Sequence, residues 1–176
     1  MSFSLIPDYV FRDYTAVTPD FLRSLGVRLL LADLDYTLAP KRQPEPDAAL
    51  LRWVESLRGG GVTLEIVSNN RSPARVERFC RGLGIGYTGH AGKPSTRGYR
   101  AAMRKHGASA AETAMLGDKL LTDTLGAERS GVTMLMVEPK GGPAGAWNRA
   151  LHAMQEPFKR ACEHDRRGNF RFFGAG

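Results

Sequence analysis

The stretch Leu29-Leu30-Leu31-Ala32-Asp33-Leu34-Asp35-Tyr36-Thr37-Leu38 decides the fold class, because an apolar run leads directly into two closely spaced carboxylates. The apolar half is typical of a buried β-strand. In an extended chain alternate side chains share a face, so Asp33 and Asp35 begin on the same side. Acids at the carboxyl end of a central strand lie where open α/β sheets bind their ligands. A lone pair of this kind more often only closes a strand, so its interpretation depends on polar groups further along the chain.

Three such polar groups occur downstream. Ser68-Asn69-Asn70 comes directly after the apolar run 62–67, and Gly117-Asp118 comes after the run 113–116. Lys93-Pro94 lies in a loop between these two groups. Because parallel strands bring their carboxyl ends to one edge of a sheet, we expect these side chains to gather beside Asp33.

Strand-like and helix-like segments alternate along the chain, which favours right-handed βαβ units. The expected strands cover residues 27–33, 62–67, 85–88, 113–116 and 132–137. One helix is expected to begin after the cap residue Asp47. Three further helices are expected over residues 72–83, 95–106 and 120–130. The predicted fold class is α/β, a three-layer Rossmann-like arrangement around a central parallel sheet.

The two ends of the chain are expected to flank this sheet. The main domain is predicted to span residues 1–140 and to include a helical N-terminal segment over residues 1–26. Residues 141–176 are predicted to form a linker, an amphipathic helix and a flexible basic tail. The helix is expected to start at Trp147 and to carry an apolar face of Leu151, Met154 and Phe158.

Taken in order, D-x-D-x-T, S-N, K-P and G-D-x-x-x-x-D resemble the four motifs of the haloacid dehalogenase (HAD) superfamily of phosphohydrolases. Ile6-Pro7-Asp8-Tyr9 and Val17-Thr18-Pro19 further resemble the capless subfamily IIIA, in its YqeG-type branch, which is related to mitochondrial phosphatidylglycerophosphate phosphatases. The similarity covers roughly residues 5–138. Tyr36 stands where this branch commonly has asparagine, and Lys119 where it commonly has glutamine. Both departures concern substrate choice more than reaction type.

The resemblance implies a role for each motif residue. Asp33 would be the nucleophile that forms an aspartyl-phosphate, and Asp35 the general acid and base. Mg²⁺ would be held by Asp33, the backbone carbonyl of Asp35, and Asp118, with Asp123 as an outer or alternate ligand. Thr37, Ser68 and Lys93 would bind the phosphoryl oxygens, and Asn69, in the same substrate-binding group, would position the leaving group or the loop. As alternatives, Thr37 is a turn residue and Asp123 a helix-turn acid, while Asn70 and Thr122 are structural.

The segments 37–62 and 70–93 leave no room for an inserted cap domain. We therefore expect an open active site. Such a site suits a large, interfacial or macromolecular substrate, or closure by a neighbouring subunit.

The net charge of +7 is concentrated in residues 71–105, where nine basic residues accompany a single acid, Glu77. These residues either form solvated helix faces or attract anionic substrates to Lys93. Three scattered aromatic residues make nucleic-acid binding a weaker interpretation. No apolar run reaches the ~20 residues that span a bilayer, and no secretory signal is evident. We expect a cytoplasmic protein, with two alternatives for the basic face: weak, reversible contact with an anionic membrane, or a surface that only faces water. The oligomeric state is left open.

The leading hypothesis is a Mg²⁺-dependent phosphomonoester hydrolase whose favoured substrate is a phosphorylated lipid headgroup such as phosphatidylglycerophosphate. The same enzyme class acting on a soluble sugar, nucleotide or protein phosphate is the alternative. A non-catalytic binding or scaffold protein is a third hypothesis. It predicts a broken motif set, whereas every motif here is intact.

Overall fold

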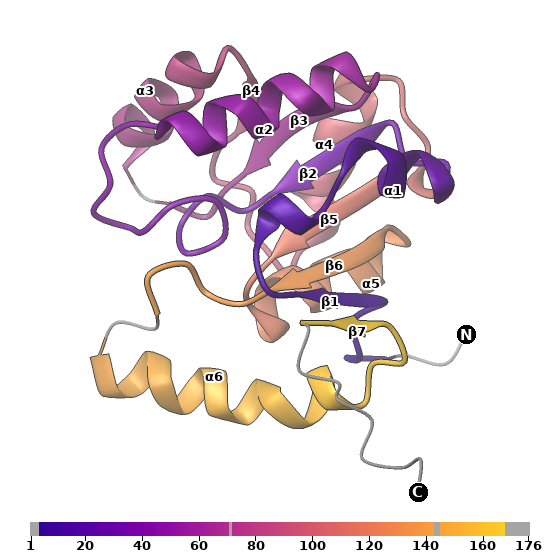
Figure 1. Ribbon diagram of the computed structural model, residues 1–176, viewed down its shortest axis with the longest axis vertical. Coiled ribbons are helices and arrows are strands. Elements are labelled where there is room, and N and C mark those ends of the chain that lie inside the picture. Colours follow the sequence, from indigo (N-terminus) through magenta and orange to yellow (C-terminus); the bar gives the residue numbers. More distant parts are fainter. Residues whose placement is uncertain (1–3, 71, 143–144, 168–176) are drawn as a thin grey trace, which may run out of the picture.

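The structure is a computed structural model that describes residues 4–70, 72–142 and 145–167. Seven strands form one sheet in the order β4-β3-β2-β5-β6-β1-β7, and every neighbouring pair is parallel (Figure 1). The strands are β1 (Tyr9–Phe11), β2 (Leu29–Ala32), β3 (Thr63–Val67), β4 (Gly86–Thr88), β5 (Thr113–Gly117), β6 (Thr133–Val137) and β7 (Asp165–Arg166). The predicted α/β fold with a central parallel sheet is confirmed.

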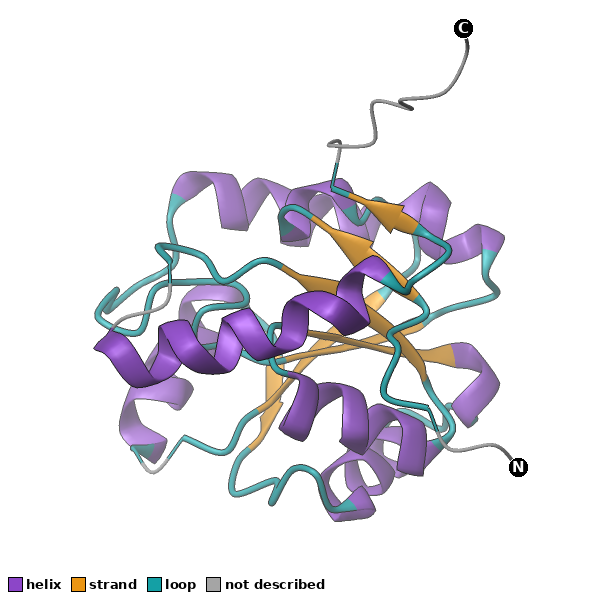
Figure 2. Ribbon diagram, turned by 90° about the horizontal axis from the view of Figure 1, so that it is seen from below, coloured by secondary structure: helices purple, strands orange, loops and turns teal. Residues whose placement is uncertain are grey.

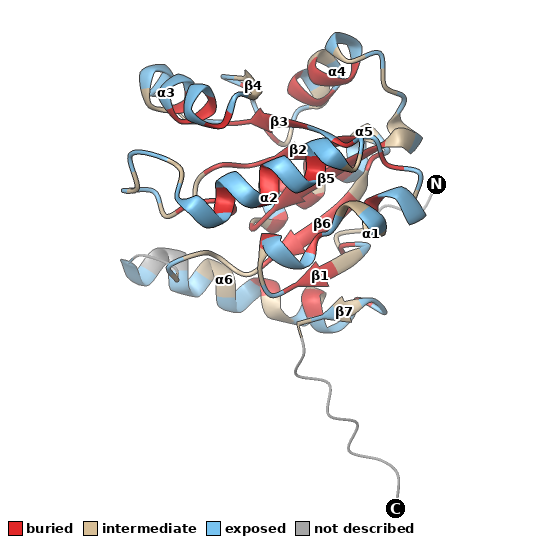
Figure 3. Cartoon of the chain, turned by 45° about the horizontal axis from the view of Figure 1, so that its top comes forward, coloured by how far each residue is buried: buried red, intermediate tan, exposed pale blue. Residues whose placement is uncertain are grey.

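Helices cover both faces of this sheet, which gives three layers (Figure 2). The helices are α1 (Pro19–Ser24), α2 (Ala48–Gly59), α3 (Pro73–Leu83), α4 (Thr96–Lys105), α5 (Leu125–Ser130) and α6 (Gly145–Arg160). Side chains of α1, α2 and α3 share one apolar cluster, and those of α4 and α5 share a second cluster on the opposite face. In Figure 3 the helices are red, and so buried, where they face the sheet, and blue, and so exposed, on their outer sides.

Local sequence signals set several helix starts. Asp47 caps α2 by accepting a hydrogen bond of 2.8 Å from the Leu50 amide, and Thr18 caps α1 by accepting one from the Phe21 amide. Gly84 ends α3 in the left-handed region, with φ of 63°. The expected helix over 120–130 consists of a π-helical turn (Leu120–Thr124) followed by α5.

The N-terminal segment differs from the predicted helix over residues 1–26. Residues 9–11 form strand β1, which pairs with β6, and a 3-10 turn (Tyr14–Ala16) precedes the short helix α1. A three-residue strand is too short to show a periodic pattern, and its hydrogen-bonding partner lies more than a hundred residues downstream. The first three residues lie outside the described part.

The C-terminal segment adds to the sheet. Strand β7 pairs with β1, so Arg166 lies in the sheet and not in the expected tail; residues 168–176 lie outside the described part. In α6 the predicted apolar face is wrong at Met154, which is 63% exposed, while Phe158 is partly buried against the core as expected. Two polar side chains that were not predicted to face inward, Gln155 and Lys159, are buried. The division into domains at residue 140 stays a prediction.

Between β2 and β3 the chain holds only a loop and α2. Between β3 and Lys93 the described residues hold only α3, β4 and short connections. The expected absence of a cap insertion therefore agrees with the described part of the chain. No helix within that part is long and apolar enough to cross a membrane.

Candidate functional site

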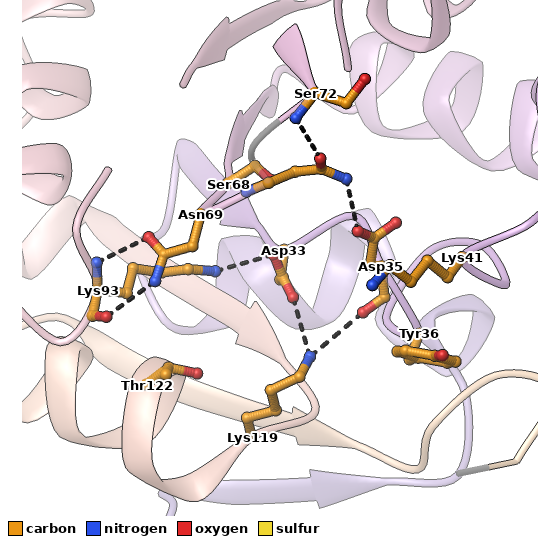
Figure 4. A pocket seen from close by; sticks show the side chains of 11 residues that line it. Asp33, Asp35, Tyr36, Lys41, Ser68, Asn69, Ser72, Lys93, Lys119 and Thr122 are labelled. Atoms are coloured by element: carbon orange, nitrogen blue, oxygen red, sulfur yellow. Dashed lines mark hydrogen bonds and ion pairs between the residues drawn. The ribbon is translucent and has the colours of Figure 1, made fainter. Parts of the chain in front are cut away.

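A pocket of about 590 Å³ opens at the carboxyl edge of the sheet, where β2, β3 and β5 end (Figure 4). Motif residues from all four predicted groups reach it or lie directly behind it. The lining residues are Asp33, Asp35, Tyr36, Lys41, Ser68, Asn69, Asn70, Ser72, Lys93, Lys119 and Thr122. The sheet thus brings together side chains that lie up to 89 positions apart in the sequence.

The carboxylate of Asp33 lies between two ammonium groups. Its Oδ1 is 2.9 Å from Nζ of Lys93, and its Oδ2 is 3.3 Å from Nζ of Lys119 (Figure 4). Burial raises the pKa of Asp33, but the two lysines outweigh it and hold this pKa below its ordinary value. Asp33 is therefore an ionised carboxylate at the pocket wall, as a nucleophile requires.

Lys93 is fixed from two directions. Its Nζ is 2.7 Å from Oδ1 of Asp123, and its backbone exchanges two hydrogen bonds of 2.8 Å with the side-chain amide of Asn69. Burial lowers the pKa of Lys93, but Asp123 and Asp33 outweigh it and raise the pKa above its ordinary value. Of the two roles predicted for Asn69, this geometry favours positioning of the loop that carries Lys93.

Asp35 lies on the other side of the pocket with partners of its own. Its Oδ2 accepts a hydrogen bond of 2.8 Å from Asn70, and its Oδ1 is 2.6 Å from Nη1 of Arg75. Arg75 also donates to the backbone carbonyl of Gln43. Sequence reasoning missed Arg75, because nothing in its pattern distinguishes it from the other arginines of α3.

Three buried carboxylates, from Asp33, Asp118 and Asp123, have oxygens within 4.8 Å of one another. Oδ2 of Asp118 is buried and has no hydrogen-bond partner among the described residues. Burial raises the pKa of Asp118 to about 6; Lys119 opposes this shift, while Asp123 and Asp33 add to it. An all-oxygen donor set with an unpaired buried oxygen fits a hard divalent cation.

Lys119 and Tyr36, the two positions at which the sequence departs from the family pattern, are in contact in the site. Nζ of Lys119 is 2.7 Å from Oδ1 of Asp118 and 3.4 Å from the carbonyl oxygen of Asp35. It also lies over the ring of Tyr36, at 5.7 Å from the ring centroid. Tyr36 itself has a φ of 69°, a backbone region that residues other than glycine rarely adopt.

The two hydroxyl groups predicted to bind phosphate have different surroundings. Ser68 lines the pocket, and its Oγ accepts a hydrogen bond of 3.0 Å from the backbone N–H of Asn70. Thr37 is buried and donates to Oδ1 of Asp118 over 2.9 Å, so its hydroxyl faces the acid cluster. A phosphate-binding role for Thr37 stays a prediction.

Helix α6 supports the site from behind, which the sequence did not indicate. The Gln155 amide accepts from the backbone N–H of Leu120 and donates over 3.3 Å to the carbonyl of Asp118. Nε2 of His152 is 3.7 Å from Oδ2 of Asp118, and burial lowers the pKa of His152. These contacts explain why α6 turns a glutamine toward the sheet.

Comparisons with known proteins identify the family of the chain. Residues 90–161 match the HAD-hydrolase-like family. The chain is 32% identical over 140 residues to the probable phosphatase YqeG of Bacillus subtilis, which covers 80% of this chain and 81% of that protein.

Solved structures share the fold at low sequence identity. An uncharacterised protein from Corynebacterium glutamicum has a TM-score of 0.53 at 18% identity, covering 76% of this chain and 96% of that one. The 3-deoxy-D-manno-octulosonate 8-phosphate phosphatase of Moraxella catarrhalis, in complex with magnesium and phosphate, has a TM-score of 0.51 at 16% identity, covering 78% and 91%. These structures share the fold, and the identity to YqeG, together with the family match, shows that the chain belongs to the haloacid dehalogenase superfamily of phosphatases, in the branch of YqeG.

Proposed function

We propose that this protein is a Mg²⁺-dependent phosphomonoester hydrolase that works through an aspartyl-phosphate on Asp33. The observation that supports this most directly is the position of its carboxylate, ionised between Lys93 and Lys119 at the wall of an open pocket. Asp35 lines the same pocket but is bonded to other residues, Asn70 and Arg75. Because their surroundings differ, the two acids can take different parts in the reaction.

The reaction proceeds in two displacements. An oxygen of Asp33 attacks the phosphorus, and the ester oxygen leaves with a proton donated by Asp35. Asp35 then accepts a proton from water, whose oxygen attacks the same phosphorus and releases inorganic phosphate and the Asp33 carboxylate. Asn70 and Arg75 hold Asp35 in place during both proton transfers.

The cation would be held by the carboxylates of Asp33 and Asp118 and by the carbonyl oxygen of Asp35, with Asp123 behind them. When bound, it neutralises the charge on the transferring phosphoryl group. The Lys93 ammonium and the Ser68 hydroxyl are the protein's own donors to the phosphoryl oxygens.

We propose a phosphorylated lipid headgroup as the favoured substrate, with reversible contact between the protein and an anionic membrane. The absence of a cap from the described residues and the open pocket support a bulky or interfacial substrate. The three lysines in the pocket lining, Lys41, Lys93 and Lys119, support an anionic substrate.

Phosphate release from an aryl phosphate, with and without Mg²⁺, tests the reaction class. Asp33→Asn should lower turnover at least a thousandfold with the fold intact, because an amide is a poor nucleophile. Asp35→Asn should lower turnover by about 10²- to 10⁴-fold, the usual contribution of acid–base catalysis. Substantial turnover by folded Asp33→Asn, or full wild-type activity after chelation, would contradict the proposal.

A panel of substrates tests the headgroup. We expect phosphatidylglycerophosphate in mixed micelles to give a higher kcat/KM than soluble sugar, nucleotide or peptide phosphates. A higher kcat/KM for a soluble phosphate than for phosphatidylglycerophosphate would make a soluble phosphate the favoured substrate.

A further inference from the structure

Lys119 helps to keep Asp33 ionised but takes part in neither displacement of the proposed reaction, although its ammonium group occupies the centre of the site. Nζ lies 2.7 Å from Oδ1 of Asp118, 3.3 Å from Oδ2 of Asp33 and 3.4 Å from the carbonyl oxygen of Asp35. These are the three groups that the proposed function assigns to the cation. We propose that Lys119 competes with the divalent cation for these oxygens, so that the cation binds as the Lys119 side chain moves away. This inference rests on the proposed function.

Simultaneous occupancy is unfavourable on distance and charge. Mg²⁺ binds its oxygen ligands at 2.0–2.1 Å with nearly octahedral geometry. A cation at that distance from Asp33 and Asp118 would lie within a few ångströms of an ammonium that bonds the same two carboxylates. Like charges so close repel strongly in a partly buried site.

Of the two lysines at Asp33, only Lys119 is placed to leave. The Lys93 side chain is 2% exposed and is held by Asp33 and Asp123 together, whereas the Lys119 side chain is 38% exposed and lines the pocket. The ring of Tyr36 already flanks the ammonium. Rotation of the Lys119 side chain into the pocket therefore needs no movement of the core.

Charge balance points the same way. The cluster holds three carboxylates, from Asp33, Asp118 and Asp123, and two ammonium groups, a net charge of −1. Without the Lys119 ammonium the net charge is −2, which a divalent cation neutralises. Lys119 thus compensates the buried acids before the cation binds and lowers the affinity for the cation that replaces it.

Titration calorimetry of the metal-free protein with MgCl₂ tests the competition without using activity. Lys119→Gln removes the ammonium and should bind Mg²⁺ roughly 10- to 100-fold more tightly, since hydrogen bonds to charged groups no longer have to break. Lys41→Gln is the matched control. It removes one positive charge from the same pocket, where Lys41 is exposed and has no ion pair within the described structure, and should leave the affinity nearly unchanged.

Circular dichroism and thermal melting of each metal-free variant establish that it is folded. The wild-type protein gives a second measurement that does not depend on the stability of Lys119→Gln. The ¹⁵N resonance of the Lys119 ammonium, assigned by its loss in Lys119→Arg, should shift in step with Mg²⁺ binding.

Equal Mg²⁺ affinities of wild type and Lys119→Gln, or a Lys119 resonance unmoved at saturation, would overturn the competition and leave a Mg²⁺-dependent phosphatase in place. Failure of both proteins to bind Mg²⁺ would overturn the competition and the proposed cation together. If Lys119→Gln binds Mg²⁺ more tightly than wild type but wild type has no phosphatase activity, the competition is supported and the proposed function is not.

Discussion

Asp33 and Asp35 are two positions apart, yet their side chains have different partners. Two lysines from distant loops hold Asp33, whereas Asn70 and Arg75 hold Asp35. The spacing of the two acids could be read from the sequence, because it is part of a motif. The arginine that holds Asp35 could not, since its role depends on how α3 packs beside the loop after β2.

At the residue scale we predict that Arg75 is a positioning residue for Asp35. Arg75→Gln should lower kcat about tenfold with little change in KM, because Asp35 keeps its bond to Asn70 but loses its second anchor. The fall in kcat/KM should be larger for alkyl than for aryl phosphates, whose better leaving groups need less help from an acid.

Arg78→Gln, one turn further along α3, is the matched control, since its side chain is exposed and lies outside the pocket lining. Arg75→Lys should restore part of the lost rate by keeping the charge. Equal effects of Arg75→Gln on both classes of phosphate, or none on either, would remove Arg75 from this role.

At the scale of elements, the buried carboxylate of Glu65 in β3 forms hydrogen bonds to β4 and α4. Glu65 is fully buried; its Oε1 accepts from Thr88 of β4 over 2.7 Å and its Oε2 accepts from Lys105 of α4 over 2.8 Å. His106, which caps α4, contacts the same oxygen. Burial raises the pKa of Glu65, but these partners outweigh it and hold the pKa below its ordinary value.

Because the pKa of Glu65 is lower in the folded state, its stabilising effect is present above the unfolded pKa of about 4.3 and is lost as pH falls through the folded value. Glu65→Gln should therefore lower the free energy of unfolding at pH 7 by about 1.5–3 kcal/mol. The difference in unfolding free energy between Glu65→Gln and wild type should shrink as the pH falls below about 4.3. Urea unfolding at pH values from about 7.5 down to about 3 measures this difference.

Glu55→Gln is the control for Glu65→Gln. Glu55 forms an exposed ion pair with Arg58 in α2. Loss of this pair should lower the free energy of unfolding by no more than about 0.5 kcal/mol. A Glu65→Gln effect that is independent of pH, or no larger than that of Glu55→Gln, would show that Glu65 acts only by filling space.

The sequence predicted elements well where their own residues determine them. Apolar runs and caps such as Asp47 identified five of the seven strands and the helices between them. It failed for β1 and for the buried face of α6. Strand β1 depends on pairing with β6. The buried face of α6 includes Gln155, which accepts a hydrogen bond from the Leu120 amide and donates one to the Asp118 carbonyl in the loop after β5. Neither long-range contact leaves a periodic apolar pattern.

At the scale of the whole molecule, the fold divides the basic segment that the sequence presents as continuous. Helices α3 and α4 pack on opposite faces of the sheet, so their arginines cannot all face one flat surface. The α3 face also carries an exposed apolar side chain, since Leu51 is 40% exposed and shares a hollow with Arg78 and Arg81. The motif order predicted which residues meet at the pocket, but only the packing shows which basic residues share a face.

If the protein contacts an anionic membrane, the α3 face is therefore the one that we expect to meet it. In vesicle co-sedimentation, wild type should bind anionic but not neutral vesicles, and binding should weaken as salt rises. The double variant Arg78→Gln/Arg81→Gln should weaken binding about tenfold or more, at about 1 kcal/mol for each arginine. The control variant Arg100→Gln/Arg104→Gln removes the same charge from exposed positions of α4. It should change vesicle binding little, because α4 covers the opposite face of the sheet.

Equal losses of vesicle binding in the two double variants would mean that the protein responds to net charge and not to a docking face. Absence of binding at low salt would leave these arginines as solvated surface and make a soluble phosphate the favoured substrate.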